Sequence, residues 1–201
     1  MKTIQHLIDG GLRVGTSGRT STVFDPATGE PSGEVALASV DEVGAAVASA
    51  GAAFEEWKNE SLAKRTRLMF EFRNLVVANA DEIAARLTSE HGKVLSDAGG
   101  EVARAIENIE FACGLAEHLK GSYSESASSG VDVYSVRRPL GVVAGITPFN
   151  FPAMVPVWMF PNAIACGNTC LLYTSPSPRD NDWYRVCRLL LEKGGGGGGG
   201  G

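Results

Sequence analysis

The sequence has few of the residues that mark several functional classes. Its 201 residues include only four cysteines and three histidines, and 20% of them are charged. No apolar run approaches the roughly 20 residues that a membrane-spanning helix needs. No basic stripe is visible, and the formal net charge is −5. We therefore expect neither a membrane nor a nucleic acid as partner.

Targeting signals are also missing from the N-terminus. The opening residues, MKTIQHLIDGG, contain one lysine and no apolar stretch of the length found in secretory signals. They also lack the Arg- and Ser-rich amphipathic pattern of an organelle import leader. We expect a cytoplasmic protein.

The cysteines form no framework. They are Cys113, Cys166, Cys170 and Cys187, in apolar or helical contexts and not in a loop-rich disulfide scaffold. Cys166 and Cys170 are four residues apart, but no histidine or further cysteine completes a metal site. We interpret all four as small hydrophobic residues and expect no metal.

The first 120 residues show helical periodicity. The segment SVDEVGAAVASAGAAFEEW opens with Ser39 and has Glu42 three residues later, which is the capping-box pattern. Apolar residues then follow at three- and four-residue steps, which predicts an amphipathic helix. Similar patterns predict helices over 62–77, from Asn79 to a C-terminal cap at Gly92, and over 95–119. Before them, HLIDGGLRV predicts a β-hairpin.

The pattern changes after residue 120. GSYSESASSG predicts a loop, and VDVYSVRRP alternates like a half-solvated strand. GVVAGIT, at 141–147, is continuously apolar and predicts a strand buried on both faces of a parallel sheet. An apolar helix over 153–166 and a strand in NTCLL follow, so this region predicts one βαβ unit.

Asn150 is the most informative position. It follows the predicted buried strand, inside the otherwise apolar run TPFNFP, and ligands of open α/β sheets bind at that edge. The amide is suited to donate to an oxyanion that develops during attack on a carbonyl. It is equally suited to cap a helix beginning at Pro152, and the spacing alone favours this plainer role. No GxGxxG loop follows the strand, so a standard dinucleotide fingerprint is not indicated.

The segment RPLGVVAGITPFNFPAMVPVWMFPNAIACGNT resembles the start of the nucleotide-binding fold in aldehyde dehydrogenases. HLIDG, DPATGE, FEEW, EHGKVLSDAGGEV and DVYSVRRPLG occur upstream in the order of that family. Phe149 in PFNFP, followed by VPVWMFP, is similar to the CoA-acylating branch that acts on methylmalonate semialdehyde. The resemblance covers about residues 5–169.

The resemblance implies a reaction and three site residues. Asn150 would donate to the thiohemiacetal oxyanion, and Thr147 and Phe149 would line the nicotinamide end of an NAD site. The implied reaction is NAD-dependent oxidative decarboxylation of methylmalonate or malonate semialdehyde, with CoA as co-substrate and propionyl-CoA or acetyl-CoA as product. Such reactions belong to valine and inositol catabolism. The parent enzyme would be a homotetramer.

The implied fold is α/β, the N-terminal part of an aldehyde dehydrogenase fold. Residues 1–120 would form the hairpin and helices of the NAD-binding domain. Residues 121–139 would be an oligomerisation arm. Residues 140–172 would form the first strand, helix and strand of a doubly wound parallel sheet, and 173–201 a foreign or disordered tail that ends in polyglycine.

The sequence departs from the family after GNT. The positions of a Lys and a Glu that contact the adenine ribose hold Tyr173 and Pro176. The catalytic glutamate and the nucleophilic cysteine would lie further along, and we do not expect a cysteine of this chain to replace the nucleophile. We therefore expect the chain alone to be inactive. The alternatives are another aldehyde dehydrogenase, of the succinate-semialdehyde or betaine-aldehyde type, and a non-catalytic fragment that pairs with full-length subunits.

Overall fold

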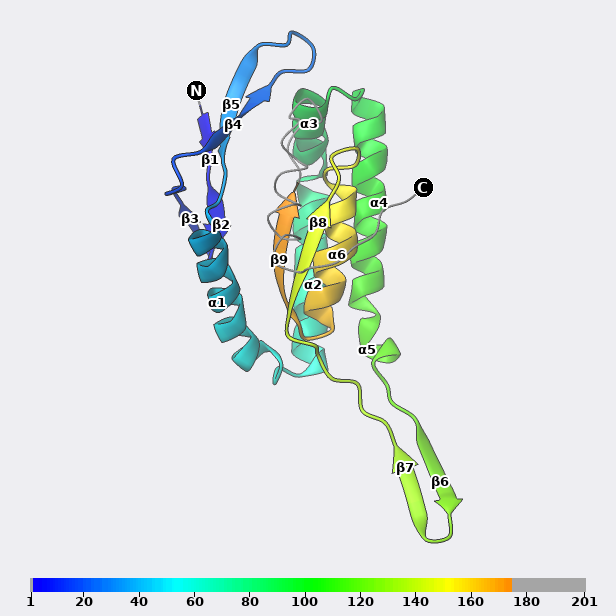
Figure 1. The fold of residues 1–201 in the computed structure, drawn as a ribbon. Coiled ribbons are helices and arrows are strands. Elements are labelled where there is room, and N and C mark those ends of the chain that lie inside the picture. Colours follow the sequence, from blue (N-terminus) through cyan, green and yellow to red (C-terminus); the bar gives the residue numbers. More distant parts are fainter. Residues whose placement is uncertain (1, 175–201) are drawn as a thin grey trace, which may run out of the picture.

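The computed structural model describes residues 2–174 (Figure 1). Its helices are α1 (Val40–Trp57), α2 (Leu62–Ala78), α3 (Ala80–His91), α4 (Leu95–Cys113), α5 (Leu115–His118) and α6 (Met154–Ala165). Its strands are β1 (Lys2–Ile4), β2 (His6–Ile8), β3 (Gly11–Arg13), β4 (Thr20–Phe24), β5 (Pro31–Ala36), β6 (Tyr123–Ser128), β7 (Val131–Tyr134), β8 (Val142–Thr147) and β9 (Thr169–Thr174). The predicted tail beyond Thr174 lies outside the described residues.

The N-terminal strands form two small sheets. β2 and β3 pair in antiparallel fashion, and Asp9 and Gly10 make the turn with φ values of 55° and 68°. This confirms the predicted hairpin. In the other sheet β5 lies between β1, which is parallel to it, and β4, which is antiparallel. None of the strands of this second sheet was predicted from the sequence.

The helices begin and end close to the predicted residues. Ser39 caps α1 through the nitrogen of Glu42, whose carboxylate accepts from the nitrogen of Ser39 at 2.7 Å, so the capping box is confirmed. Gly92 ends α3 with a left-handed φ of 84°. The single helix predicted over 95–119 is wrong in one respect. It breaks at Gly114 into α4 and the short α5.

The predicted βαβ unit is confirmed. β8 and β9 are parallel, with Val143 opposite Cys170, and α6 connects them. In Figure 1 the two strands lie between α1 and α6. At Gly145 an added Cβ would lie 3.1 Å from the Met159 sulfur, so α6 packs closely on β8 at this glycine. β9 runs to Thr174, two residues past the predicted boundary at 172.

β8 is less buried than its composition predicts. Val142 is 36% exposed and Ile146 40% exposed, whereas a strand covered on both faces would hide both. The side chains that point away from α6 meet only part of α1. The described residues thus cover one face of β8 well and the other face partly.

The core lies among α2, α3, α4 and α6. Ile109 and Ala98 of α4 are fully buried, and Val102 is 2% exposed. Two hydrogen bonds tie α1 to α6 and to β9. The indole nitrogen of Trp57 donates to the carbonyl of Ile164 at 2.9 Å, and the Thr169 hydroxyl donates to the carbonyl of Ala50 at 2.9 Å.

A long hairpin, β6 and β7, projects away from this body (Figure 1). The loop predicted over 121–130 is wrong, because its central residues form β6. The half-solvated strand predicted after it is also corrected, since every residue of β6 and β7 is exposed. A strand of alternating apolar and polar residues usually packs its apolar face on other elements. No element within residues 2–174 covers either face of β7. No helix in the described range has the length and hydropathy to cross a membrane.

Candidate functional site

An open cavity of about 600 Å³ lies where α3 and α4 meet the turn before α6. This turn, residues 148–153, joins β8 to α6 and carries Asn150. The cavity is lined by His91, Lys93, Ser96, Asp97, Gly100, Glu101, Arg104, Asn150, Phe151 and Met154. It is the candidate functional site because it contains the predicted oxyanion donor.

Asn150 does not cap α6. The helix begins at Met154 with Ala153 at the N-cap position, and no side chain of that position makes a capping bond. Asn150 is exposed at the edge of the cavity, and its backbone carbonyl accepts a hydrogen bond from Lys93 Nζ at 3.3 Å. The capping role considered for this residue is therefore wrong.

Glu101 takes the capping role instead. Its Oε1 accepts from the backbone nitrogens of Ala153 at 2.8 Å and of Met154 at 3.0 Å. Glu101 is 3% exposed, although it belongs to α4, more than fifty residues away in sequence. A carboxylate at this end of a helix satisfies free N–H groups and is favoured by the helix dipole.

Lys93 completes the charge pair. Its ammonium pairs with Glu101 Oε2, and its side chain is only 10% exposed. The same ammonium lies 4.8 Å from the ring centroid of Phe151. Lys93 therefore contacts both Asn150 and Phe151, while Glu101 binds the start of α6.

Phe149 packs against His91. The two rings are stacked with centroids 5.4 Å apart. Burial lowers the pKa of His91, the nearby Lys93 charge lowers it further, and Glu101 opposes the shift. Its Nδ1 is buried without a hydrogen-bond partner within the described residues. The neutral imidazole of His91 thus lines the cavity and packs beside Phe149.

Thr147 ends β8 at the same edge. It is 2% exposed, and its hydroxyl donates to the carbonyl of Tyr173 at 3.4 Å. The structure therefore brings the three predicted site residues, Thr147, Phe149 and Asn150, to one strand end and the turn after it. That edge is the one at which open α/β sheets bind ligands.

Lys93 and Glu101 were missed as site residues. Both lie in EHGKVLSDAGGEV, which pointed only to a family resemblance. A signal was present, since Glu101 is an acid on the apolar stripe formed by Ala98, Val102 and Ala105. A buried carboxylate requires partners. The sequence does not say which ones.

The described cysteines fit their predicted structural role. Cys113, Cys166 and Cys170 are free, and burial raises the pKa of each thiol. A raised pKa leaves little thiolate at neutral pH, so none is set up as a nucleophile. Over residues 2–174 no cluster of His, Cys, Asp and Glu is suited to hold a metal ion.

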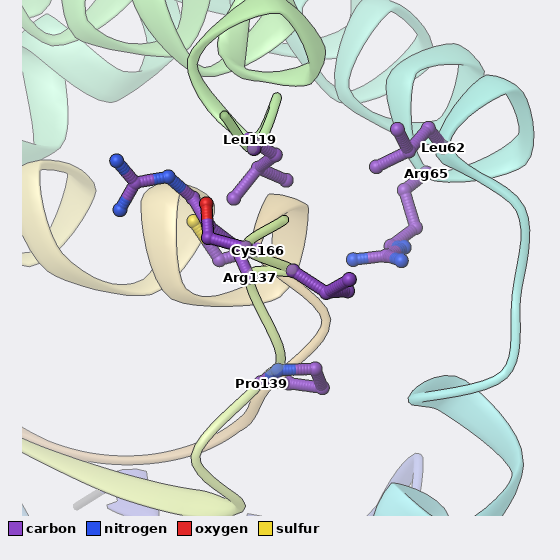
Figure 2. Close-up of a pocket in the computed structure, with 9 residues that line it drawn as sticks. Leu62, Arg65, Leu119, Arg137, Pro139 and Cys166 are labelled. Atoms are coloured by element: carbon purple, nitrogen blue, oxygen red, sulfur yellow. The ribbon is translucent and has the colours of Figure 1, made fainter. Parts of the chain in front are cut away.

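A second cavity, of about 300 Å³, lies between the start of α2 and the base of the hairpin (Figure 2). Leu62 and Arg65 point into it from α2, with Cys166 and Leu119 on the opposite side. The Arg65 guanidinium is already held by the carbonyls of Glu60 and Ala165, at 3.1 Å and 3.3 Å. None of the predicted site residues lines this cavity.

Comparison with known proteins gives consistent matches. A malonate-semialdehyde dehydrogenase of Pseudomonas aeruginosa is 49% identical over 180 residues, which are 90% of this chain and 36% of that protein. The crystal structure of a methylmalonate-semialdehyde dehydrogenase of Oceanimonas doudoroffii matches with a TM-score of 0.86 and 48% identity, over 96% of this chain and 39% of the other. A structure from Sinorhizobium meliloti, assigned to the same activity and complexed with NAD, matches with a TM-score of 0.86, 45% identity and the same coverage.

The chain thus spans little more than a third of the length of these relatives. Its fold is the corresponding part of the aldehyde dehydrogenase fold, as predicted. The model of the aldehyde dehydrogenase family matches residues 14–179, which include the candidate site. The chain belongs to the aldehyde dehydrogenase family.

Proposed function

We propose that this chain supplies the oxyanion donor of an NAD-dependent semialdehyde dehydrogenase. The reaction is the oxidative decarboxylation of methylmalonate or malonate semialdehyde, with CoA as acyl acceptor. The observation that carries the proposal is the placement of Asn150 at the rim of the 600 Å³ cavity, on a turn fixed by buried charges. High identity to relatives named for these two semialdehydes supports the substrate class.

The chemistry assigns Asn150 one step. A cysteine thiolate from a part of the enzyme outside this chain attacks the aldehyde carbon, and the carbonyl oxygen becomes an oxyanion. The Asn150 amide donates a hydrogen bond to that oxygen, and such a donor is worth about a hundred- to thousandfold in rate. The amide does not serve α6, because Glu101 takes the two helical N–H groups.

The charges around the cavity suit a substrate that carries a carboxylate. Lys93 is already paired with Glu101, but Arg104 lines the same cavity from α4 and pairs only at the surface with Glu107, at 2.9 Å. Exposed pairs of this kind contribute little and exchange partners easily. Arg104 is therefore the side chain that we expect to attract the acidic end of a semialdehyde.

The described residues fit one end of NAD. Thr147 and Phe149 lie at the carboxyl end of β8, where they would line the nicotinamide, which accepts a hydride when bound. The adenine-ribose end does not fit. Tyr173 stands in β9 where the family resemblance expects a lysine, and Pro176 lies outside the described residues.

The remaining parts of the proposal concern the whole protein. CoA as co-substrate and a homotetramer follow from the acylating branch that the sequence resembles, and a cytoplasmic location follows from the N-terminal residues, in which no targeting pattern is visible. The exposed β6–β7 hairpin supports an oligomerisation arm, because Val131, Val133 and Tyr134 present apolar surface to solvent. We expect the chain by itself to be catalytically inactive.

A chimeric enzyme tests the proposal. Residues 14–169 of this chain replace the matching segment of the Pseudomonas aeruginosa malonate-semialdehyde dehydrogenase. We expect NADH formation with malonate and methylmalonate semialdehyde in the presence of CoA, and weak activity with propionaldehyde. Arg104→Ala should raise KM for the acidic substrates about tenfold or more, which corresponds to about 1.4 kcal/mol, with little effect on propionaldehyde.

Three results would count against the proposal. A folded chimera that prefers propionaldehyde would refute the substrate class. Preference for succinate semialdehyde or betaine aldehyde would favour the alternative aldehyde dehydrogenases. If the chimera is folded but inactive, and the 201-residue chain binds the full-length Pseudomonas enzyme, a non-catalytic pairing role gains support.

A further inference from the structure

We infer that Glu101 and Lys93 are positioning residues that fix the 148–153 turn and thereby aim Asn150. The inference rests on the proposed function for its catalytic meaning. Its structural content stands independently, since it concerns which groups order the turn.

The turn is fixed at its C-terminal end by Glu101. One carboxylate oxygen binds two successive backbone nitrogens, those of Ala153 and Met154, at 2.8 Å and 3.0 Å. The partners lie on different elements, α4 and the start of α6. Because two bonds converge on one oxygen, both the position and the direction of the first turn of α6 are set.

The turn is fixed in its middle by Lys93. Its ammonium bridges Glu101 Oε2 and the carbonyl of Asn150, and it also lies over the ring of Phe151. Asn150 itself is exposed, so little packing holds this residue directly. The Lys93 contact is the one hydrogen bond to Asn150 among the described residues.

Stability alone gives no reason for this arrangement. Glu101 is 3% exposed, and desolvating a carboxylate and an ammonium offsets much of their attraction. Apolar residues of similar volume are often as stable in such a place. The pair does what an apolar pair cannot do, which is to bind the N–H groups and the carbonyl of the turn. The pair thus provides order at the site that carries Asn150.

The test uses the full 201-residue chain and the double substitution Lys93→Met with Glu101→Met. Removal of both charges leaves no unpaired ion, so the fold is retained. Amide hydrogen exchange is followed by NMR at Ala153 and Met154, together with the backbone order parameter of Asn150. We expect exchange of the two amides to accelerate about a hundredfold, and the Asn150 order parameter to fall below about 0.6, the range of flexible backbone.

Two controls separate positioning from general stability. Glu110→Gln removes a charge from the exposed pair with Arg73, which joins α2 and α4, and should leave both readouts unchanged. Glu101→Gln keeps an acceptor oxygen and should retain part of the protection at Ala153 and Met154. Amides in the middle of α4, such as that of Ile109, should keep their wild-type exchange in every variant.

Three outcomes would overturn the inference. These are unprotected Ala153 and Met154 amides in the wild-type chain, unchanged exchange and order in the double variant, and equal acceleration at Ile109. The measurement needs neither cofactor nor aldehyde. An inactive chimera with an ordered turn would reject the proposed function alone, and an active one with a disordered turn would reject the inference alone.

Discussion

Glu101 and Asp132 both accept hydrogen bonds from other residues of the chain, and their surroundings differ completely. Glu101 binds the nitrogens of Ala153 and Met154 and is 3% exposed. Asp132 binds the nitrogen of Ser126 at 2.9 Å and the hydroxyl of Tyr123 at 2.7 Å, on a hairpin where every residue is exposed. Hydrogen bonds to a carboxylate therefore serve two purposes in this chain. Glu101 joins distant segments around a site, whereas Asp132 shapes a local bend.

The burial of each carboxylate decides what its bonds contribute. Around Glu101 water cannot replace a lost partner, so an unpaired group carries its full desolvation cost. Around Asp132 water is present on all sides and competes for both donors. The two bonds still lower the pKa of Asp132, the Ser126 nitrogen more than the Tyr123 hydroxyl. The comparison indicates that the bonds of Glu101 join α4 to the start of α6, whereas the bonds of Asp132 act within the exposed hairpin.

The largest effect on stability is expected from removing the buried carboxylate, that of Glu101. Glu101→Ala leaves Lys93 charged and buried, and frees two N–H groups of α6. Breaking a buried pair in this way costs about 3–5 kcal/mol of the free energy of unfolding. Asp132→Ala should leave the urea midpoint of the chain unchanged. Equal midpoint shifts for the two variants would show that burial does not decide how much each carboxylate contributes to stability.

A slightly smaller effect on stability is expected from shortening a buried apolar side chain of the body, compared with an exposed one of the hairpin. Ile109 is fully buried on α4, so Ile109→Ala should lower the free energy of unfolding by about 3 kcal/mol through lost burial and a cavity. The matched change in the hairpin, Val133→Ala, removes methyl groups that are 53% exposed. Urea denaturation of both variants should give a near-zero change for the second. A shift above about 1 kcal/mol for Val133→Ala would mean that the hairpin packs on the body.

A third effect depends on pH. The Glu42 carboxylate accepts from the nitrogens of Ser39 and Thr16, and these bonds lower its pKa to about 2. Because the folded pKa is depressed, the contribution of the capping box is present above the unfolded value near 4.5 and is lost as pH falls toward 2. Thermal melting of wild type and Glu42→Gln should therefore differ at pH 6 and converge by pH 2. A constant difference across that range would contradict the assignment.

The smallest effect on stability is expected in the hairpin itself. Val133→Ser should change the free energy of unfolding by less than about 0.5 kcal/mol, as surface substitutions do. In the chimeric enzyme the same change should shift the sedimentation profile from tetramer toward smaller species, if the hairpin is the oligomerisation arm. An unchanged tetramer would remove the hairpin from the proposed interface.

The sequence predicts the local parts of this structure well. Ser39 and Glu42 lie within one turn, and Gly92 needs a left-handed φ, so both signals act over a few residues. Part of the candidate site could be located from the sequence, because Asn150 lies in the turn that follows β8. Glu101 could not be assigned, since its partners lie more than fifty residues away and are backbone groups without a sequence signature. The strand β6 was missed because YSESAS has the composition of a loop and pairs only through its neighbour β7.

The most direct test of the account is the turnover of the chimeric enzyme with Asn150→Ala. If Asn150 donates to the oxyanion, kcat for malonate semialdehyde should fall by about a hundred- to thousandfold while the melting temperature stays unchanged. The Asn150 side chain caps no helix, so its loss should not unfold the protein. A kcat within about threefold of the parent chimera would contradict the account.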